Sequence, residues 1–284
     1  MPTSTEPNRF SERSIDTMPS RLLRWSVQSI AEVLLPSAPA ATMIRLKSLV
    51  AHPMARVRLL CIPYAGAGIV SFRPWAKLLP PHVEAFAVQL PGRENRIADT
   101  PFTDWGAMRH ALIDAVSALP AFPTVIFGHS LGAVIGLDLA RYLQQSSPSS
   151  LVHLFVSGHP WPGGLTHHAG NTSDLDDSEL LQLLNQRYGS LDTSLSHPEI
   201  REVVMRALRA DLQLLNSYRY SALAPLTCPL TAFMGCNDPA TTIENVEAWR
   251  QESTGLFRAV SLKGNHFFIE SQRTELVSTI VSSL

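Results

Sequence analysis

The sequence has few cysteines, few charges and no long hydrophobic run, and each shortage excludes a class of protein. Its three cysteines (Cys61, Cys228 and Cys236) form no CxxC pair, which excludes a disulfide framework; we expect reduced core thiols in a cytoplasmic protein. Charged residues make up 17% of the sequence and the formal net charge is −1, so the chain has no strong overall electrostatic field to attract nucleic acid or an anionic membrane. No apolar run reaches the roughly 18 residues of a membrane-spanning helix. The 45% of hydrophobic residues nevertheless suffice for a large core.

The amino-terminal segment differs in composition from the rest of the chain. Residues 1–20 are rich in Ser, Thr, Pro and mixed charge, which is typical of disorder, and residues 21–35 are compatible with one short amphipathic helix. Polar residues interrupt that helix and acidic residues occur throughout, so neither a secretory signal nor a transit peptide is predicted. We expect residues 1–42 to be a dispensable extension and residues 43–284 to form one domain.

Short apolar runs bounded by Pro and Gly alternate with segments of helical periodicity. This alternation predicts an α/β fold, with a mostly parallel central sheet flanked by helices on both faces. Between about 160 and 222 no strand-like run occurs, and helical stretches at 174–187 and 198–218 predict a helical lid insertion. Strands are predicted at 57–63, 83–91, 123–130, 150–158, 228–235 and 256–262, and further helices at 72–79, 103–119, 131–145 and from about Glu270.

Residues 128–132 read Gly-His-Ser-Leu-Gly, a G-x-S-x-G pattern between a predicted strand and a predicted helix. In this pattern the serine lies on a strained turn, where side chains at the two glycine positions would collide with their surroundings. The turn directs the Ser130 hydroxyl out of the sheet and places the Leu131 N–H at a helix N-terminus, which favours developing negative charge. The pattern therefore predicts an α/β-hydrolase fold with Ser130 as nucleophile and Leu131 as an oxyanion-hole donor.

A serine nucleophile needs a base and an orienting carboxylate, and in this fold they follow in the order Ser, acid, His. His266 lies in the loop after the last predicted strand, and Asp238 follows the strand 228–235. Because active sites of parallel sheets form at the carboxyl ends of the strands, we assign Asp238 as the acid and His266 as the general base. Asp211 and Glu244 remain alternative acids.

The other histidines are weaker candidates for the base. The geometry of the turn directs His129 away from the serine, and His153 lies within a predicted strand. His159, His167 and His168 have no carboxylate or cysteine at ligand spacing, so no metal site is predicted.

The loop Pro-Tyr-Ala-Gly-Ala-Gly at 63–68 follows the first predicted core strand. Its glycines permit close approach of the backbone to a substrate, so we assign the Ala65 N–H as the second oxyanion-hole donor. A merely flexible glycine loop is the alternative. The loop matches neither a dinucleotide fingerprint nor a phosphate-binding P-loop, and no cofactor is expected.

Several motifs together resemble the type II thioesterases, the stand-alone editing hydrolases of nonribosomal peptide and polyketide synthases. They are PYAGAG (63–68), F-x-x-W (72–75), VQLPGRENR (88–96), FGHSLGA (127–133), LRADLQLLNSYRY (208–220), CPLTAFMGCNDP (228–239) and GNHFF (264–268). The resemblance implies the same triad, Ser130, Asp238 and His266. It also implies hydrolysis of acyl groups from the phosphopantetheine thioester of acyl or peptidyl carrier proteins, as transient partners of a monomer.

Some features leave alternatives open. A fatty-acyl carrier-protein thioesterase or a product-releasing thioesterase shares most of these motifs, while a general carboxylesterase and a non-catalytic binding module fit less well. Arg93 and Arg96 are either contacts for a carrier-protein phosphate or solvated loop residues, and Trp161 either lines the acyl pocket or packs the lid. The arginines of the lid stretch 201–219 are a candidate dock for an acidic carrier protein: Arg201, Arg206, Arg209 and Arg219.

Overall fold

The computed structural model describes residues 43–165, 172, 174–189 and 198–284. The amino-terminal extension lies outside these residues, so its predicted disorder, short helix and dispensability stay predictions. Within the described part of the chain no helix is long and apolar enough to cross a membrane.

Seven strands form one sheet in the order β1-β3-β2-β4-β5-β6-β7. β1 pairs antiparallel with β3 and all other neighbours are parallel, which confirms the predicted mostly parallel sheet. The strands are β1 (Arg45–Val50), β2 (Val57–Ile62), β3 (Val83–Gln89), β4 (Thr124–His129), β5 (Leu151–Ser157), β6 (Leu230–Gly235) and β7 (Phe257–Leu262). β1 was not predicted, because this edge strand is partly exposed along its length and lacks a continuous apolar run.

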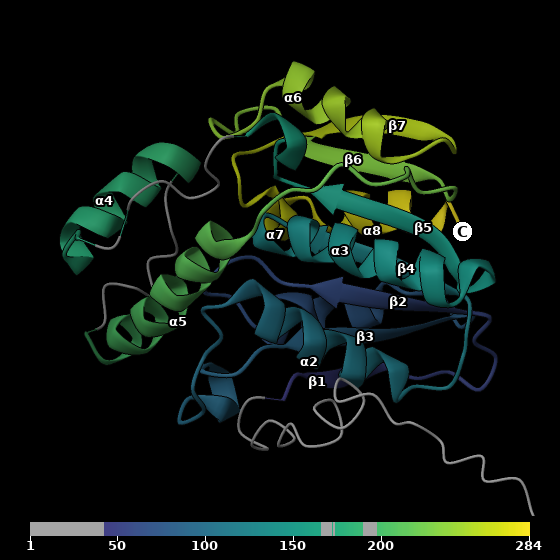
Figure 1. The fold of residues 1–284 in the computed structure, drawn as a ribbon, viewed down its shortest axis with the longest axis horizontal. Helices are drawn as coiled ribbons and strands as arrows, with labels where there is room; N and C mark the ends of the chain where they lie inside the picture. The colour runs from purple at the N-terminus through teal and green to yellow at the C-terminus, as the bar shows by residue number, and fades with distance from the viewer. Residues whose placement is uncertain (1–42, 166–171, 173, 190–197) are drawn as a thin grey trace, which may run out of the picture. The chain divides into compact units, whose positions relative to one another are not determined.

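Side chains of successive strand residues point to opposite faces, and each face carries its own core. In β2, Leu60 and Ile62 belong to one core and Leu59 and Cys61 to the other. The first core is covered by α2 (Trp105–Ser117), which the Asp104 side chain caps, and by α3 (Leu131–Ser146). The second core is covered by the 3₁₀ helix η2 (Ile69–Lys77), by α7 (Phe268–Ser271) and by α8 (Arg273–Val281). Figure 1 shows the resulting layers.

The segment between β5 and β6 carries α4 (Asp177–Tyr188) and α5 (Pro198–Ser217), and its described residues include no strand. On α5 the apolar residues Leu208, Leu212 and Leu215 are buried, as their helical spacing predicts. Figure 1 shows the arrowheads of the parallel strands pointing toward the side where α4 and α5 lie. The remaining short helices are η3 (Glu94–Arg96), η4 (Pro148–Ser150), η5 (Pro162–Gly164), α6 (Ile243–Glu247) and η7 (Ala248–Glu252).

The prediction that all three cysteines are core thiols is wrong for Cys236. Cys61 and Cys228 are buried, and burial raises the pKa of Cys228 to about 11 and that of Cys61 still further. Cys236 is exposed, because it stands one residue beyond the end of β6, where the chain turns into a loop.

Candidate active site

The turn between β4 and α3 places Ser130 in a strained conformation. Ser130 has φ of 54° and ψ of −117°, outside the regions that residues with a side chain normally adopt. Its N–H donates to Ser157 O of β5 at 2.7 Å, which anchors the turn to the neighbouring strand. Strain of this kind persists only where the surrounding structure enforces it, and here it presents the serine at the first turn of α3.

The two glycines of the motif are required by close backbone packing. A Cβ atom at Gly128 would overlap Gly132 O, and one at Gly132 would overlap the Ile62 carbonyl at the end of β2. The strand, the turn and the helix therefore approach one another more closely than any larger residue permits.

Asp238 and His266 form a buried pair at the carboxyl ends of the last two strands. Asp238 Oδ2 lies 2.8 Å from His266 Nδ1, and both side chains are almost fully shielded from solvent. The other carboxylate oxygen, Oδ1, accepts from Ala240 N at 2.9 Å, so the carboxylate is held at both oxygens. A carboxylate on Nδ1 keeps the proton there, which leaves Nε2 as the ring nitrogen able to accept a proton.

Backbone hydrogen bonds join the loops that carry this pair. Cys236 N donates to Leu262 O at 2.8 Å and Asn237 N donates to Gly264 O at 2.9 Å. Gly264 has φ of 119°, which a residue with a side chain rarely adopts. The two loops therefore form one unit, and the separation of acid and base does not depend on side-chain packing alone.

The His266 ring lies 5.1 Å from that of His129, the residue preceding Ser130, measured between centroids. Among the described residues no hydrogen bond joins Ser130 Oγ to His266, a bond that is often long until substrate is seated. The His129 side chain is buried, and its Nδ1 lies 2.9 Å from Ser157 Oγ of β5. Burial, together with neighbouring His266, holds the pKa of His129 well below its usual range, so it is a neutral support beneath the site.

The two N–H groups assigned to the oxyanion hole are both available as donors. Leu131 is the first residue of α3, where N–H groups lack a helical acceptor. Within the described residues neither the Leu131 N–H nor the Ala65 N–H donates to another protein group. The loop 63–68 follows directly on β2, beside the strand that ends at the turn.

Comparison with known proteins identifies the family. The model of the thioesterase domain family matches residues 57–284. The chain belongs to this family. It is 35% identical to the gramicidin S biosynthesis protein GrsT of Aneurinibacillus migulanus over 234 residues, covering 81% of this chain and 90% of GrsT.

Solved structures agree with this assignment and with the α/β-hydrolase fold. The type II thioesterase BorB from the borrelidin biosynthetic cluster has a TM-score of 0.76 and 32% identity, covering 85% of this chain and 97% of BorB. RedJ, a thioesterase of the prodiginine pathway in Streptomyces coelicolor, has a TM-score of 0.74 and 33% identity, covering 83% and 96%. The predicted resemblance to type II thioesterases is confirmed, and the protein is a hydrolase that acts on thioesters.

Neither interpretation of Arg93 and Arg96 in the sequence is correct for this thioesterase. Both are buried, so they are neither solvated nor exposed to a partner's phosphate. Arg93 forms a two-pronged ion pair with Asp211, and Arg96 donates to Asp99 at 2.6 Å. Asp211 is therefore engaged elsewhere, and Glu244, the other alternative acid, is exposed on α6.

The arginines of the lid stretch 201–219 do not form one open basic surface. Arg201 donates to Ser178 and Arg209 to Asp177, so these two side chains hold α4 against α5. Arg206 and Arg219 are exposed, and in the described residues their hydrogen bonds go to backbone carbonyls. At most these two arginines remain available to a partner at this surface.

Aromatic side chains connect the lid insertion to the site and to the core. The Tyr188 ring at the end of α4 lies 4.5 Å from the His266 ring, centroid to centroid, at an interplanar angle of 40°. Trp161 Nε1 donates at 2.7 Å to the buried carboxylate of Glu252, which also accepts from Tyr220 and pairs with Arg141. Because Trp161 and Tyr220 stand at the two ends of the insertion, one carboxylate anchors both, which supports packing as the role of Trp161.

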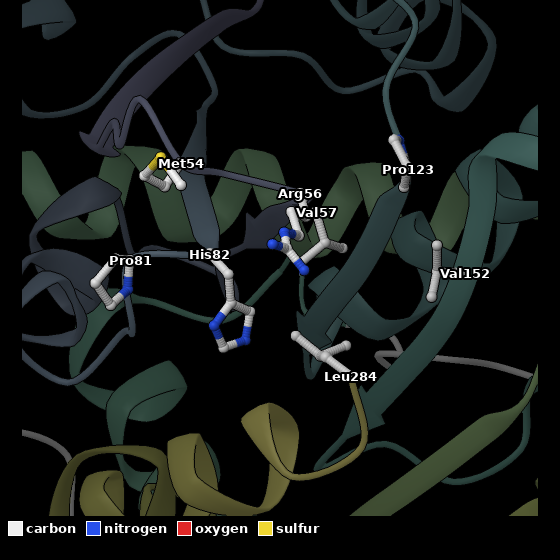
Figure 2. Close-up of a pocket in the computed structure, with 8 residues that line it drawn as sticks. All are labelled: Met54, Arg56, Val57, Pro81, His82, Pro123, Val152 and Leu284. Carbon is white, nitrogen blue, oxygen red and sulfur yellow. The ribbon is translucent and has the colours of Figure 1, made fainter.

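A separate cavity of about 730 Å³ lies at the opposite edge of the sheet. Figure 2 shows its lining residues, which lie at or before the amino ends of β2, β3, β4 and β5 and at Leu284: Met54, Arg56, Val57, Pro81, His82, Pro123, Val152 and Leu284. It includes neither the serine nor the acid–base pair, so it is not the catalytic site. Among the described residues no group of three His, Cys, Asp or Glu side chains is placed to hold a metal, and His167 and His168 lie outside them.

Proposed function

We propose that this thioesterase hydrolyses acyl groups from the phosphopantetheine thioester of acyl or peptidyl carrier proteins, with Ser130, Asp238 and His266 as its triad. The strained serine turn beside a buried Asp–His pair is the observation that carries the proposal. The names of GrsT, BorB and RedJ, each tied to a biosynthetic pathway, favour an editing role beside a synthase.

The proposed reaction has two halves. His266 Nε2 takes the proton of Ser130 Oγ as this oxygen attacks the thioester carbonyl, and the N–H groups of Leu131 and Ala65 stabilise the resulting oxyanion. The intermediate collapses, the C–S bond breaks, and the thiol leaves with the proton held by His266. Water, deprotonated by the same nitrogen, then attacks the acyl-enzyme, which releases the carboxylic acid and restores Ser130.

We further propose a monomer in the cytoplasm that meets its carrier protein transiently. An editing enzyme must accept many stray acyl groups, so recognition rests on the carrier protein and its pantetheine arm. Each methylene in an apolar pocket changes transition-state binding by about 1–3 kcal/mol at most. An editing pocket should be shallow and stay well below that limit. With about 1.4 kcal/mol of discrimination across the whole series, acetyl-, propionyl- and butyryl-carrier proteins should be hydrolysed within about tenfold of one another, and the matching coenzyme A thioesters more slowly.

The test measures kcat/KM for that acyl series on one carrier protein, beside a long-chain acyl substrate and a simple ester. Ser130→Ala should abolish turnover and labelling by a fluorophosphonate, whereas Ser278→Ala, which removes an exposed hydroxyl from α8, should change neither. A preference above a thousandfold for long chains would favour the fatty-acyl alternative, and equal activity on the simple ester would favour a carboxylesterase. Full turnover by Ser130→Ala would overturn the assignment of the nucleophile.

A further inference from the structure

The loop 63–68, which carries the proposed oxyanion donor Ala65, is held by an ion pair that the mechanism does not use. Arg93 Nη2 lies 2.7 Å from Asp211 Oδ1, and Arg93 Nη1 lies 2.8 Å from Asp211 Oδ2. The two side chains are 4% and 1% exposed. Arg93 follows β3 and Asp211 lies on α5, so the pair joins the sheet to the second helix of the lid insertion.

Both partners of this pair also bond the backbone of the loop. Asp211 Oδ2 accepts from Gly66 N at 2.7 Å, and Arg93 Nη1 donates to Ala67 O at 2.8 Å. Within the loop itself, Ala67 N donates to Tyr64 O at 3.0 Å. Every peptide unit from Tyr64–Ala65 to Ala67–Gly68 therefore has its N–H or its C=O fixed.

These bonds determine where the Ala65 N–H points. Its peptide unit is planar and trans, so the N–H is directed opposite to the Tyr64 carbonyl, which Ala67 N holds. The next peptide unit is fixed at Gly66 N by Asp211. With the units on both sides of the Ala65 Cα held, this N–H has little freedom to turn away from the site.

Packing of α5 against the loop also restricts the loop. Gly66 has φ of 77°, and a Cβ atom there would lie 3.3 Å from Leu208 Cβ, one helical turn before Asp211. The helix thus touches the loop both through a carboxylate and through an apolar side chain. A loop with four glycines or alanines after Tyr64 has no bulky side chains of its own to fix its course.

We propose that the Arg93–Asp211 pair is a positioning device, which holds the Ala65 N–H in the geometry needed to stabilise the oxyanion. The inference rests on the proposed serine mechanism. It makes Asp211 and Arg93 positioning residues, since neither touches the reacting atoms. Preorganised donors stabilise a transition state because they need no reorientation during the reaction, and removing one typically costs about 10²–10³ in kcat.

The deciding variant is Asp211→Asn, which keeps the size of the side chain but removes the charge that Arg93 and Gly66 share. We expect kcat/KM per active site to fall by about tenfold to a hundredfold, less than loss of a whole donor, with KM changed by less than about threefold. Because an alkyl boronic acid forms a tetrahedral adduct on the serine, its inhibition constant should rise by a similar factor. Active sites are counted by fluorophosphonate labelling.

Glu84→Gln provides the matched control. It also removes a carboxylate from a short ion pair, with Arg58 at 2.7 Å, but at the other end of β2 and β3. We expect a lowered melting temperature with kcat unchanged. Arg93→Lys keeps a cation opposite Asp211 while losing the fork, so it should give an intermediate loss of kcat even if Asp211→Asn fails to fold.

Three outcomes are distinguishable. Parallel losses in kcat/KM and boronate binding, absent from Glu84→Gln, support the positioning role. Full kcat per labelled site in Asp211→Asn and Arg93→Lys, with only a lowered melting temperature, overturns it and leaves the pair structural. Unchanged turnover in Ser130→Ala overturns the proposed function instead, because the oxyanion would then not form at this serine.

Discussion

Replacing Asp238 by asparagine tests the assignment of Asp238 as the acid that orients His266. Both carboxylate oxygens have partners: Oδ1 accepts from Ala240 N at 2.9 Å and Oδ2 lies 2.8 Å from His266 Nδ1. An asparagine in this position keeps its oxygen toward the Ala240 N–H, since its NH2 group cannot accept. The NH2 group then faces His266 Nδ1, which must become an acceptor, and the ring proton moves to Nε2.

In that tautomer Nε2 cannot take the proton of Ser130. The expected loss in kcat is about 10⁴-fold, the value found for the same change in a serine protease triad. At 1.36 kcal/mol per tenfold, this corresponds to about 5 kcal/mol of transition-state stabilisation. Because the side chain keeps its shape and its bond to Ala240, the melting temperature should change much less than the rate.

The assay follows release of the free thiol from an acyl thioester, with circular dichroism and thermal unfolding to verify the fold. Glu244→Gln serves as the control, since it makes the same carboxylate-to-amide change at an exposed residue of α6 close to Asp238 in the chain. Its kcat should equal that of the unmodified enzyme. Retention of kcat within about tenfold by Asp238→Asn would refute the tautomer reasoning and the assignment of the acid.

Two further predictions concern glycine packing and acid stability. Gly132→Ala should lower both stability and kcat, because its methyl group would overlap the Ile62 carbonyl and overpacking typically costs about 1–3 kcal/mol. Gly136→Ala is the control and should keep its activity, because its methyl group meets only side-chain atoms, at 3.2 Å and beyond. Equal melting curves and rates for the two variants would contradict the reasoning. Burial lowers the pKa of His153 to about 4, so the neutral imidazole is favoured in the folded state. The unfolded chain binds a proton at this residue below about pH 6.5, so the free energy of unfolding falls as the pH drops from 6.5 toward 4, by about 3 kcal/mol at most. In His153→Gln the free energy of unfolding, measured by chemical denaturation between pH 6.5 and 4, should therefore depend less steeply on pH. An unchanged slope would show that His153 is not a source of acid sensitivity.

Much of the fold could be predicted because the signals are local. Parallel strands buried on both faces appear as continuous apolar runs, and six of them were located to within about two residues of their bounds. β1 was not predicted because this edge strand, partly exposed along its length and paired antiparallel with β3, carries no such run. The short alternation of apolar and polar residues in IRLK at residues 44–47 was the available signal.

The serine turn is also a local property of the sequence. Five consecutive residues determine the strained turn of Ser130, since two glycines permit contacts that no other residue allows. The order of the strands then implied which loops would carry Asp238 and His266, because carboxyl ends of parallel strands meet at one edge. The distance between these two side chains agrees with that expectation.

Burial of the charged residues was decided only by the tertiary structure. Arg93 and Asp211 are 118 residues apart, and nothing in the sequence of either segment indicates that they meet. The same holds for Glu252, which joins both ends of the lid insertion, and for Cys236, which ends up exposed just past a buried strand. Spacing along the chain thus determined the strands, the turn and the nucleophile. Long-range packing decided pairs such as Arg93–Asp211 and Arg141–Glu252, since each forms where two distant segments are brought together and leaves no periodicity in either.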